Sequence, residues 1–435
     1  MESNVFTMHS LGGQKMINVV SLPESASLQA IDDGVIYFSP YRDLHEDRVG
    51  SFGVRFREDV ERSKLLVDTA VWDFATIALA VCAADETINR RNYSEDGWTR
   101  AIKLKIHLCN PGRWQPEIHK IERMLRFLTG DFWILEFGDG GCPPPNVDTP
   151  RFFHADGVTL LSGGMDSLVG AIDLVASGVS PLALSHIVTG NKKAQTCFAQ
   201  EVGCKQFLWN RVTHRPRLIP YGEDSTRSRS LVFFAFASVA TSVLAPFFDE
   251  HKKIFVAENG FISLNLASDP LRVGSLSTKT THPIYMAALQ DVFNDIGLNI
   301  DFVLNYKFKT KGEMLDQCSN QALLRRHIFE STSCSRYGRK RMHCGACVPC
   351  MVRRAAFMKV GWQDTTPYIH NRLMNGMPDV GAMSLACLKL HGVHGEDRLK
   401  SRFLFCDRAD VANYFGVYKR GLLEVEALLR SHGVL

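Results

Sequence analysis

The 435-residue sequence has little net charge, no internal repeats and no low-complexity tracts. Its 50 Lys and Arg residues nearly balance its 46 Asp and Glu residues, giving a formal charge of +4. Bulk charge therefore does not point to a nucleic acid or a membrane as a partner. With 45% hydrophobic and 22% charged residues, the composition also excludes a disordered, collagenous or disulfide-scaffold chain. Because ~150 residues are usual for one domain, this length predicts two or three compact units.

The chain also lacks a recognisable secretory signal at its start, so we expect a cytoplasmic protein. One uncharged run, residues 230–248, is long enough to consider as a membrane span. Ser and Thr residues dilute this run, Pro246 interrupts it, and it lies among alternating strand and helix patterns. A buried helix is therefore the better interpretation, and we expect no membrane partner.

Residues 1–150 are expected to form a separate α+β domain that recognises a partner or substrate. Apolar residues recur with helical spacing over 66–81 and again over 118–128. Between these segments, residues 102–108 alternate apolar and polar side chains, as a half-exposed strand does. The Gly- and Pro-rich tract at 138–145 marks a linker at the end of this domain.

From residue 158 onward, short apolar strand patterns alternate with helical ones. This order implies parallel strands joined by crossover helices, and hence a doubly wound, Rossmann-like α/β sheet whose ligands bind at the carboxyl ends of the strands. We assign residues 151–362 to this domain. Residues 363–435 are expected to be a helical extension that docks an amphipathic segment on the body of the protein.

The strongest motif is Ser-Gly-Gly-Met-Asp-Ser at residues 162–167, between an apolar strand and a helical pattern. Two glycines let the backbone approach an anion closely, while a helix start offers free N–H groups and the serines add hydroxyl donors. We therefore predict a phosphate-binding loop. The Gly-Lys-Ser/Thr ending of a Walker A loop is missing, which argues against the usual γ-phosphate-transferring NTPase. The alternative is a glycine turn before an N-capped helix.

Four of the 12 cysteines cluster with the spacing C-x9-C-x2-C-x2-C; these are Cys334, Cys344, Cys347 and Cys350. The two-residue gaps bring thiolates around a tight turn to one ion, and four thiolates suit a closed, tetrahedral Zn²⁺ site. A redox pair and an iron–sulfur cluster are the alternatives. Since a closed site leaves no position for a substrate, we expect the metal to stabilise the fold and not to take part in catalysis. The eight scattered cysteines are expected to be small buried hydrophobic side chains.

Together, the two motifs resemble those of the PP-loop ATP pyrophosphatases, and specifically of the QueC-like (7-cyano-7-deazaguanine synthase-like) family. Residues 162–167 match the SGGxDS signature of PP-loop enzymes, and 332–357 resemble the zinc-binding tail of QueC. Between them, Ser228-Arg229-Ser230 and Lys311-Gly312-Glu313 are similar to family segments at the same places. The resemblance covers about residues 150–362.

The sequence departs from QueC where that family carries a GYPDCR-like segment. Here Glu258-Asn259-Gly260 is followed by a longer stretch that reaches Pro283. This region is more similar to the QueC-like proteins of antiphage-defence operons, the QatC type.

The resemblance implies an ATP site, formed by Ser162, Gly163, Gly164, Met165, Asp166 and Ser167, with Ser185 and His186 where PP-loop enzymes bind adenosine. Asp166 would either order the loop or help to hold Mg²⁺. Lys311 and Arg229 are candidate phosphate clamps that would offset charge as pyrophosphate leaves. Glu258 follows an apolar strand, so it would read the edge of the base or bind Mg²⁺, unless it is a simple turn carboxylate. His282 is a candidate base for the incoming amine, although a helix cap or an exposed side chain is favoured.

The activity implied by the resemblance is ATP-dependent adenylation of the carboxylate of 7-carboxy-7-deazaguanine, followed by transfer to an amine. We expect the amine to belong to a partner protein of the same defence operon, because the additional 150-residue domain provides a docking surface. The alternatives are nitrile synthesis with ammonia, as in QueC, and a non-catalytic subunit that binds ATP or a modified base. A basic run from Arg336 to His343 is expected to be a solvated loop, so direct nucleic-acid binding is not favoured.

Overall fold

The computed structural model describes the chain except for residues 1–9, 12–13, 27–31, 188–189, 226, 245–250, 267–278, 338–340 and 404–407. By its packing the chain forms two compact units, and each is assembled from several stretches of sequence. The first unit comprises Met1–His154, Trp209–Lys252 and Tyr285–Asp301, and the second comprises Ala155–Leu208, Lys253–Ile284 and Phe302–Leu435. The predicted middle domain therefore contributes two segments to the first unit.

A seven-stranded sheet forms the first unit, with the order β10-β4-β3-β2-β5-β6 and with β1 also beside β2. Its strands are β1 (Ser10–Leu11), β2 (Gln14–Ser21), β3 (Val35–Pro40), β4 (Val49–Phe52), β5 (Ala101–His107), β6 (Phe132–Gly138) and β10 (Thr213–His214). The pairs among β2 to β6 are parallel, and only the short strands β1 and β10 pair antiparallel. This largely parallel sheet corrects the α+β arrangement expected for residues 1–150. The sequence misled because, among the described residues, no α-helix lies between β2 and β3 or between β3 and β4.

The helices of the first unit are α1 (Val54–Arg62), α2 (Thr69–Thr87), α3 (Arg90–Tyr93), α4 (Pro111–Trp114), η2 (Gln115–Glu117), α5 (Ile118–Thr129), α8 (Arg229–Ala240), η3 (Thr241–Val243) and α10 (Pro283–Asp295). Helices α2 and α8 pack on each other, and both are buried along most of their lengths. A helix that is apolar all round needs such a core position. The structure thus confirms a buried helix in the first part of the uncharged run, while residues 245–248 lie outside the described residues. None of the helices described is both long and apolar enough to cross a membrane.

The second unit contains a five-stranded sheet with the order β12-β11-β7-β8-β9. Its strands are β7 (Gly157–Leu160), β8 (Pro181–His186), β9 (Gln206–Trp209), β11 (Lys252–Phe255) and β12 (Ile300–Val303). The central strand β7 pairs parallel with both β8 and β11. Since β7 and β8 are joined by a helix, this part confirms the predicted α/β order with parallel strands.

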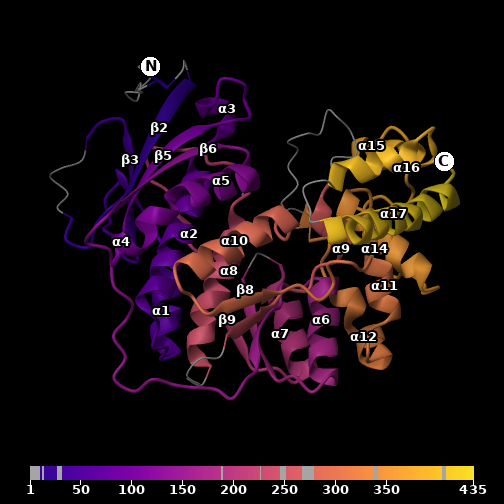
Figure 1. Ribbon diagram of the computed structural model, residues 1–435, viewed down its shortest axis with the longest axis horizontal. Helices are drawn as coiled ribbons and strands as arrows, with labels where there is room; N and C mark the ends of the chain where they lie inside the picture. Colours follow the sequence, from indigo (N-terminus) through magenta and orange to yellow (C-terminus); the bar gives the residue numbers. More distant parts are fainter. Residues whose placement is uncertain are drawn as a thin grey trace. The chain divides into compact units, whose positions relative to one another are not determined.

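The helices of the second unit are α6 (Met165–Ala176), α7 (Lys192–Val202), α9 (Gly260–Leu264), α11 (Lys311–Asp316), α12 (Gln321–His327), η5 (Ile328–Glu330), α14 (Val348–Lys359), α15 (Pro378–His391), α16 (Gly395–Lys400), η6 (Ser401–Phe403) and α17 (Arg408–Ser431). Helices α6, α7, α11, α12 and α14 share one apolar core. The carboxyl-terminal helices form a second core, in which α17 packs along α14 and α15 (Figure 1). The predicted docking of an amphipathic tail is therefore confirmed, with Leu422, Val425 and Leu429 buried.

Candidate functional site

The predicted phosphate loop joins the end of β7 to the start of α6 in the second unit. Gly163 adopts φ +82°, a conformation that side chains other than glycine rarely allow. Gly164 is the N-cap of α6, and a Cβ there would lie 3.3 Å from both the Ser162 hydroxyl and the Thr332 carbonyl oxygen. Gly163 is thus required by the backbone conformation, while a side chain at Gly164 would need its neighbours to shift by a few tenths of an ångström. The first N–H groups of α6 have no acceptor within the helix, which is the usual basis of an anion site at a helix start.

Two other segments of the second unit hold this loop. The Ser162 carbonyl accepts hydrogen bonds from Asn191 Nδ2 at 3.4 Å and from Gln195 Nε2 at 3.1 Å, both at the start of α7. Much later in the sequence, the Thr332 backbone N–H donates to the Gly163 carbonyl at 2.9 Å. Within the loop, the Ser167 hydroxyl donates to the Gly164 carbonyl at 2.9 Å. The loop backbone is therefore anchored before any ligand binds.

Asp166 and Lys311 form a buried ion pair at the start of α6. Lys311 Nζ lies 2.6 Å from Asp166 Oδ1, and the two side chains are 8% and 11% exposed, respectively. The other carboxylate oxygen, Oδ2, accepts from the backbone N–H of Asn259 at 3.2 Å and from its side-chain Nδ2 at 2.7 Å. Asp166 thereby positions one cation and one amide near the glycine loop. The sequence did not predict this pair, whose members are 145 residues apart, and the roles expected for Asp166 and Lys311 toward ATP stay predictions.

The position of Lys311 follows from a capping box that the sequence also displays. Thr310 accepts from the Glu313 backbone N–H, and the Glu313 side chain accepts from the Thr310 N–H, so α11 begins at Lys311. Arg420 of α17 pairs with Glu313 at 2.5 Å and so connects the carboxyl-terminal helix to the same turn.

Glu258 follows β11 and lies in a polar cluster with Thr281 and Ser263. The Thr281 hydroxyl donates to Glu258, and the Ser263 and Thr281 hydroxyls are 2.8 Å apart. Burial, together with the nearby charge of Asp166, raises the pKa of Glu258 to about 7, against the opposing effects of Thr281 and Lys311. A carboxylate with such a pKa can change protonation state near neutral pH, which a plain turn carboxylate does not do.

The predicted adenosine residues end the neighbouring strand β8. Ser185 is fully buried, donates to the Leu161 carbonyl at 2.7 Å and accepts from Gln206 at 2.9 Å. The His186 carbonyl accepts from Gln195 at 3.0 Å, so the same glutamine contacts both this strand end and the glycine loop. These bonds give Ser185 a structural task, and its role toward adenosine stays a prediction.

His282 immediately precedes α10 and belongs to the second unit. Its Nδ1 accepts from the Ile284 backbone N–H at 3.2 Å, which is the helix-capping contact weighed in the sequence. Burial and the charge of Lys279 lower the pKa of His282 to about 4. The imidazole is therefore neutral at physiological pH.

The four clustered cysteines come together as predicted and are at most 7% exposed. The Sγ atoms of Cys344 and Cys350 are 3.9 Å apart, as are those of Cys347 and Cys334. Around a tetrahedral zinc ion with bonds of about 2.3 Å, neighbouring sulfurs would be about 3.8 Å apart. The four thiols are free, so this spacing is not due to disulfides. The residues present therefore fit Zn²⁺.

Backbone and side-chain contacts fix the four-cysteine cluster on the second unit. The N–H groups of Cys344 and Cys347 each donate to a cysteine sulfur at 3.3 Å, which is how metal-bound thiolates are usually stabilised. Arg353, fully buried in α14, donates to the Ser331 hydroxyl at 2.7 Å. Since Thr332 contacts the glycine loop, this segment couples the four-cysteine cluster to the candidate phosphate site.

Arg229 lies elsewhere, as the first residue of α8 in the first unit. Its side chain is exposed, while the preceding Ser228 donates from both its N–H and its hydroxyl to the buried Asp85, at 3.0 and 2.8 Å. The predicted clamp therefore belongs to a different compact unit from the glycine loop, and its contact with phosphate stays a prediction.

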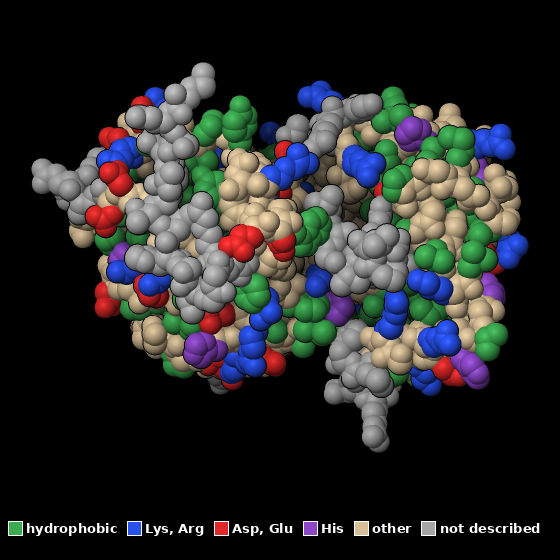
Figure 2. Space-filling model, turned by 90° about the horizontal axis from the view of Figure 1, so that it is seen from above, with side chains coloured by type: hydrophobic (Ala, Val, Ile, Leu, Met, Phe, Trp, Pro, Cys, Tyr) green, Lys and Arg blue, Asp and Glu red, His purple; other side chains and the backbone are tan. Residues whose placement is uncertain are grey.

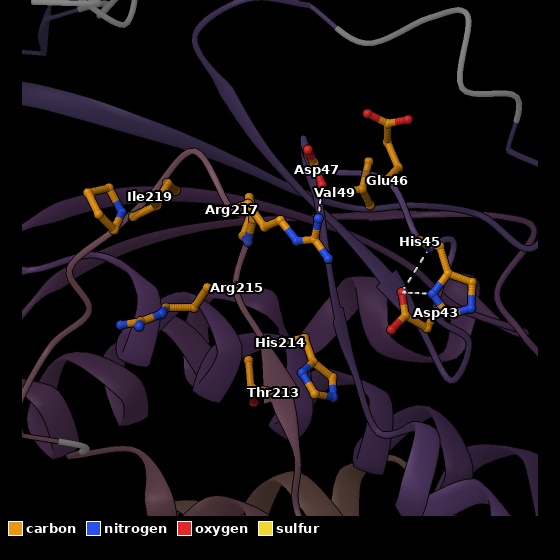
Figure 3. A pocket seen from close by; sticks show the side chains of 12 residues that line it. Asp43, His45, Glu46, Asp47, Val49, Thr213, His214, Arg215, Arg217 and Ile219 are labelled. Carbon is orange, nitrogen blue, oxygen red and sulfur yellow. Dashed lines mark hydrogen bonds and ion pairs between the residues drawn. The ribbon is translucent and has the colours of Figure 1, made fainter.

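A pocket of about 520 Å³ lies on the first unit and contains none of the predicted site residues. In Figure 3, Arg217 points toward Asp47 and His45 toward Asp43. Arg217 and Asp47 are 2.8 Å apart and are 82% and 59% exposed, so this is a solvated pair of little energetic weight.

Basic side chains do not form one field on the face drawn in Figure 2, where Lys and Arg are spread among apolar and neutral groups. Of the basic run weighed in the sequence, Arg339 and Lys340 lie outside the described residues. The small net charge remains the stronger guide to partners.

Sequence reasoning missed several residues that build the site, namely Asn259, Gln195, Thr281 and Thr332. For Asn259 a signal existed, because Asn before a helix is a common N-cap and its side chain accepts from Ile262 here. The contacts of Gln195 and Thr332 with the loop are made through backbone carbonyls, which leave no mark in the sequence of the loop itself.

No known protein-family model matches this chain, and neither a curated protein nor a solved structure shows significant similarity to it.

Proposed function

We propose that this protein is a QueC-like, QatC-type ligase that adenylates the carboxylate of 7-carboxy-7-deazaguanine with ATP and then transfers the acyl group to an amine. The observation that carries the proposal is the anchored glycine loop at a helix start beside the buried Asp166–Lys311 pair. The four-cysteine cluster, linked to the loop through Thr332, is the second support.

In the first half-reaction, a carboxylate oxygen of the base attacks the α-phosphorus of ATP, and pyrophosphate leaves. The loop N–H groups would bind the phosphate oxygens, and the Lys311 ammonium would offset the charge that develops on the leaving pyrophosphate. Asp166 would act as a positioning residue, because its carboxylate already accepts from Lys311 and Asn259. Mg²⁺ that arrives with ATP would neutralise phosphate charge, with Asp166 and Glu258 as the nearest acidic candidates for a ligand.

In the second half-reaction, the amine nitrogen attacks the acyl carbon, AMP leaves and the nitrogen loses a proton. An adenylate makes this possible because AMP is a far better leaving group than oxide. Glu258 would hold the donor edge of the base in its carboxylate form. Zn²⁺ on the four cysteines would hold the Thr332 segment in place and take no part in either bond-breaking step.

For the acceptor we favour an amine of a partner protein from the same defence operon, with the first unit providing the docking surface. Free ammonia would need no such additional unit. A protein acceptor would gain the mass of the base, while ammonia would give the amide and then, with a second ATP, the nitrile.

Mass spectrometry of complete reactions tests the proposal. Purified protein is incubated with Mg-ATP and 7-carboxy-7-deazaguanine, with and without the proteins encoded beside it, and AMP, nitrile and protein masses are measured. We expect base-dependent AMP and a mass increase on one partner. Rapid nitrile formation from ammonium with no modified protein would replace our acceptor with ammonia. Absence of AMP under all conditions would favour a binding subunit without turnover.

A further inference from the structure

A second group of metal-ligating side chains lies in the second unit, apart from the four-cysteine cluster. Cys197 and Glu201 are four residues apart on α7 and therefore share one face of that helix. His327 ends α12, and Glu330 ends the following turn η5. The sequence gives no warning of this group, because 130 residues separate Cys197 from His327.

Three of these side chains present donor atoms to a common point. Cys197 Sγ lies 3.7 Å from His327 Nδ1, and a Glu330 carboxylate oxygen lies 3.9 Å from the same nitrogen. All three donor atoms lie within 4.8 Å of one another. Sulfur and nitrogen ligands of one tetrahedral zinc ion would be about 3.6 Å apart, and nitrogen and oxygen ligands about 3.4 Å. The two separations from His327 Nδ1 are thus within about 0.5 Å of this zinc geometry, and ligation would draw the three donors closer together.

The fourth side chain orients the histidine. A Glu201 carboxylate oxygen accepts a hydrogen bond of 3.2 Å from His327 Nε2, the ring nitrogen that does not contact Cys197. The His327 side chain is only 8% exposed. A carboxylate on the second ring nitrogen is the usual partner of a metal-binding histidine, because it fixes the tautomer and leaves Nδ1 as the ligand atom. Two carboxylates and a thiol around one buried imidazole also form a site that favours a cation.

We propose that Cys197, His327 and Glu330 bind a divalent ion of the zinc class, with Glu201 as the positioning residue and one coordination position open to solvent. Mixed sulfur, nitrogen and oxygen ligands suit Zn²⁺ or Co²⁺ and do not suit Mg²⁺ or Ca²⁺. The ion would connect the two segments that carry Gln195 and Thr332, both of which anchor the glycine loop. Its binding would therefore stiffen the loop from both sides.

Metal counting by native mass spectrometry of the full chain tests this site. After equilibration with Zn²⁺ and removal of weakly bound ions by a mild chelator, we expect two zinc ions per wild-type chain and one in Cys197→Ser. Cys204→Ser is the matched control, since this thiol lies just after α7 and outside the group, and it should retain two. Cys347→Ser should lose the other ion and keep this one.

Two further variants separate ligation from a structural effect. Glu330 is exposed, so Glu330→Gln should fold normally and weaken only the second ion. Glu201→Gln should keep two ions but lower the affinity of the second by roughly 10- to 100-fold, as loss of an orienting carboxylate does elsewhere. Co²⁺ bound at this site should show a sulfur-to-metal charge-transfer band that Cys197→Ser removes. One zinc ion in the wild type, or two in folded Cys197→Ser, would overturn the proposal.

Discussion

Both units bury ion pairs, but the two sets of charges are organised differently. In the first unit, Arg100 lies 2.5 Å from Asp85 and 2.6 Å from Asp131, and Arg90 lies 2.7 Å from Asp131. These four side chains are at most 4% exposed. Burial alone would raise the pKa of Asp85, yet Arg100 and Arg90 outweigh it and lower that pKa to about 2. Each of these four charged groups thus lies within 3.2 Å of an opposite charge.

The second unit has the buried pair Asp166–Lys311 beside a loop with a helix start, and a second carboxyl group, Glu258, near it. Here the negative charges are not fully balanced by positive ones, because burial and the Asp166 charge raise the pKa of Glu258 to about 7. A buried network of paired charges, as around Asp85 in the first unit, serves the fold. A buried group of charges that are only partly paired, beside a helix start, is suited to bind and release charged groups.

The largest effect is expected from Cys347→Ser, which tests whether the second unit depends on metal and not on charge. Loss of one thiolate should release the ion of the four-cysteine cluster and lower the free energy of unfolding by more than ~5 kcal/mol, since structural zinc supplies folding energy directly. Metal content and denaturant unfolding measure this, with Cys204→Ser as the control. A variant that kept its zinc and its stability would refute the four-thiolate site.

Arg100→Met should come next, because it leaves Asp85 and Asp131 buried without their main partner. We expect a loss of about 3–5 kcal/mol in the free energy of unfolding. Arg217→Met removes an exposed arginine from its pair with Asp47 and should change stability by less than about 0.5 kcal/mol. Equal effects of the two substitutions on stability would contradict the structural role assigned to the buried charges of the first unit.

Lys311→Met tests the functional role proposed for the buried pair of the second unit. It should slow base-dependent AMP formation by roughly 100- to 1,000-fold, as loss of one preorganised charge at a developing anion does. Its effect on stability should be smaller than that of Arg100→Met, because only one pair is broken and Asp166 keeps its hydrogen bonds from Asn259. Lys307→Met is the control, since Lys307 is 42% exposed and pairs loosely with Asp410 at 3.7 Å. If stability fell and activity per folded molecule did not, the pair would be structural.

The smallest effect is a pH dependence set by Glu258. If the carboxylate form is active, AMP formation should rise with pH up to about 7 and level off above it, falling about tenfold per pH unit on the acid side. Because the folded-state pKa is raised, the protonated group favours folding, so stability should decrease as pH rises from the ordinary carboxyl range to about 7. Glu258→Gln should remove both trends. A rate profile in this variant that still bends near neutral pH would assign the titration to another group.

The second unit was the more predictable from sequence. Its strands are short apolar runs, and β7, β8, β11 and β12 are each followed by a helix, so most of the order of elements after residue 158 could be read directly. The sequence does not predict that segments of the middle region belong to the first unit. Helices α8 and α10 have the pattern of crossover helices, and their apolar surfaces suit the core of either unit. In the first unit, no described α-helix lies between β2 and β3 or between β3 and β4, so these strands lack the helical pattern that indicates parallel pairing.

The residues of the candidate site also differ in how well the sequence predicts them. Glu258 was found because it ends an apolar strand, and Asp166 because it lies in the Ser-Gly-Gly-Met-Asp-Ser motif, whereas Lys311 was singled out mainly by the family resemblance. Asn259 lies 93 residues from its partner Asp166, and Cys197 lies 130 residues from His327. Such contacts depend on tertiary packing, for which local patterns carry no signal.

The central claim is most directly tested by isotope exchange between labelled pyrophosphate and ATP, which reports adenylate formation independently of the final acceptor. With Mg²⁺ and 7-carboxy-7-deazaguanine, we predict exchange that requires the base, is retained in Lys307→Met and is reduced in Lys311→Met in step with AMP release. Neither exchange nor AMP release above the level with ATP alone, in correctly folded protein, would contradict the account.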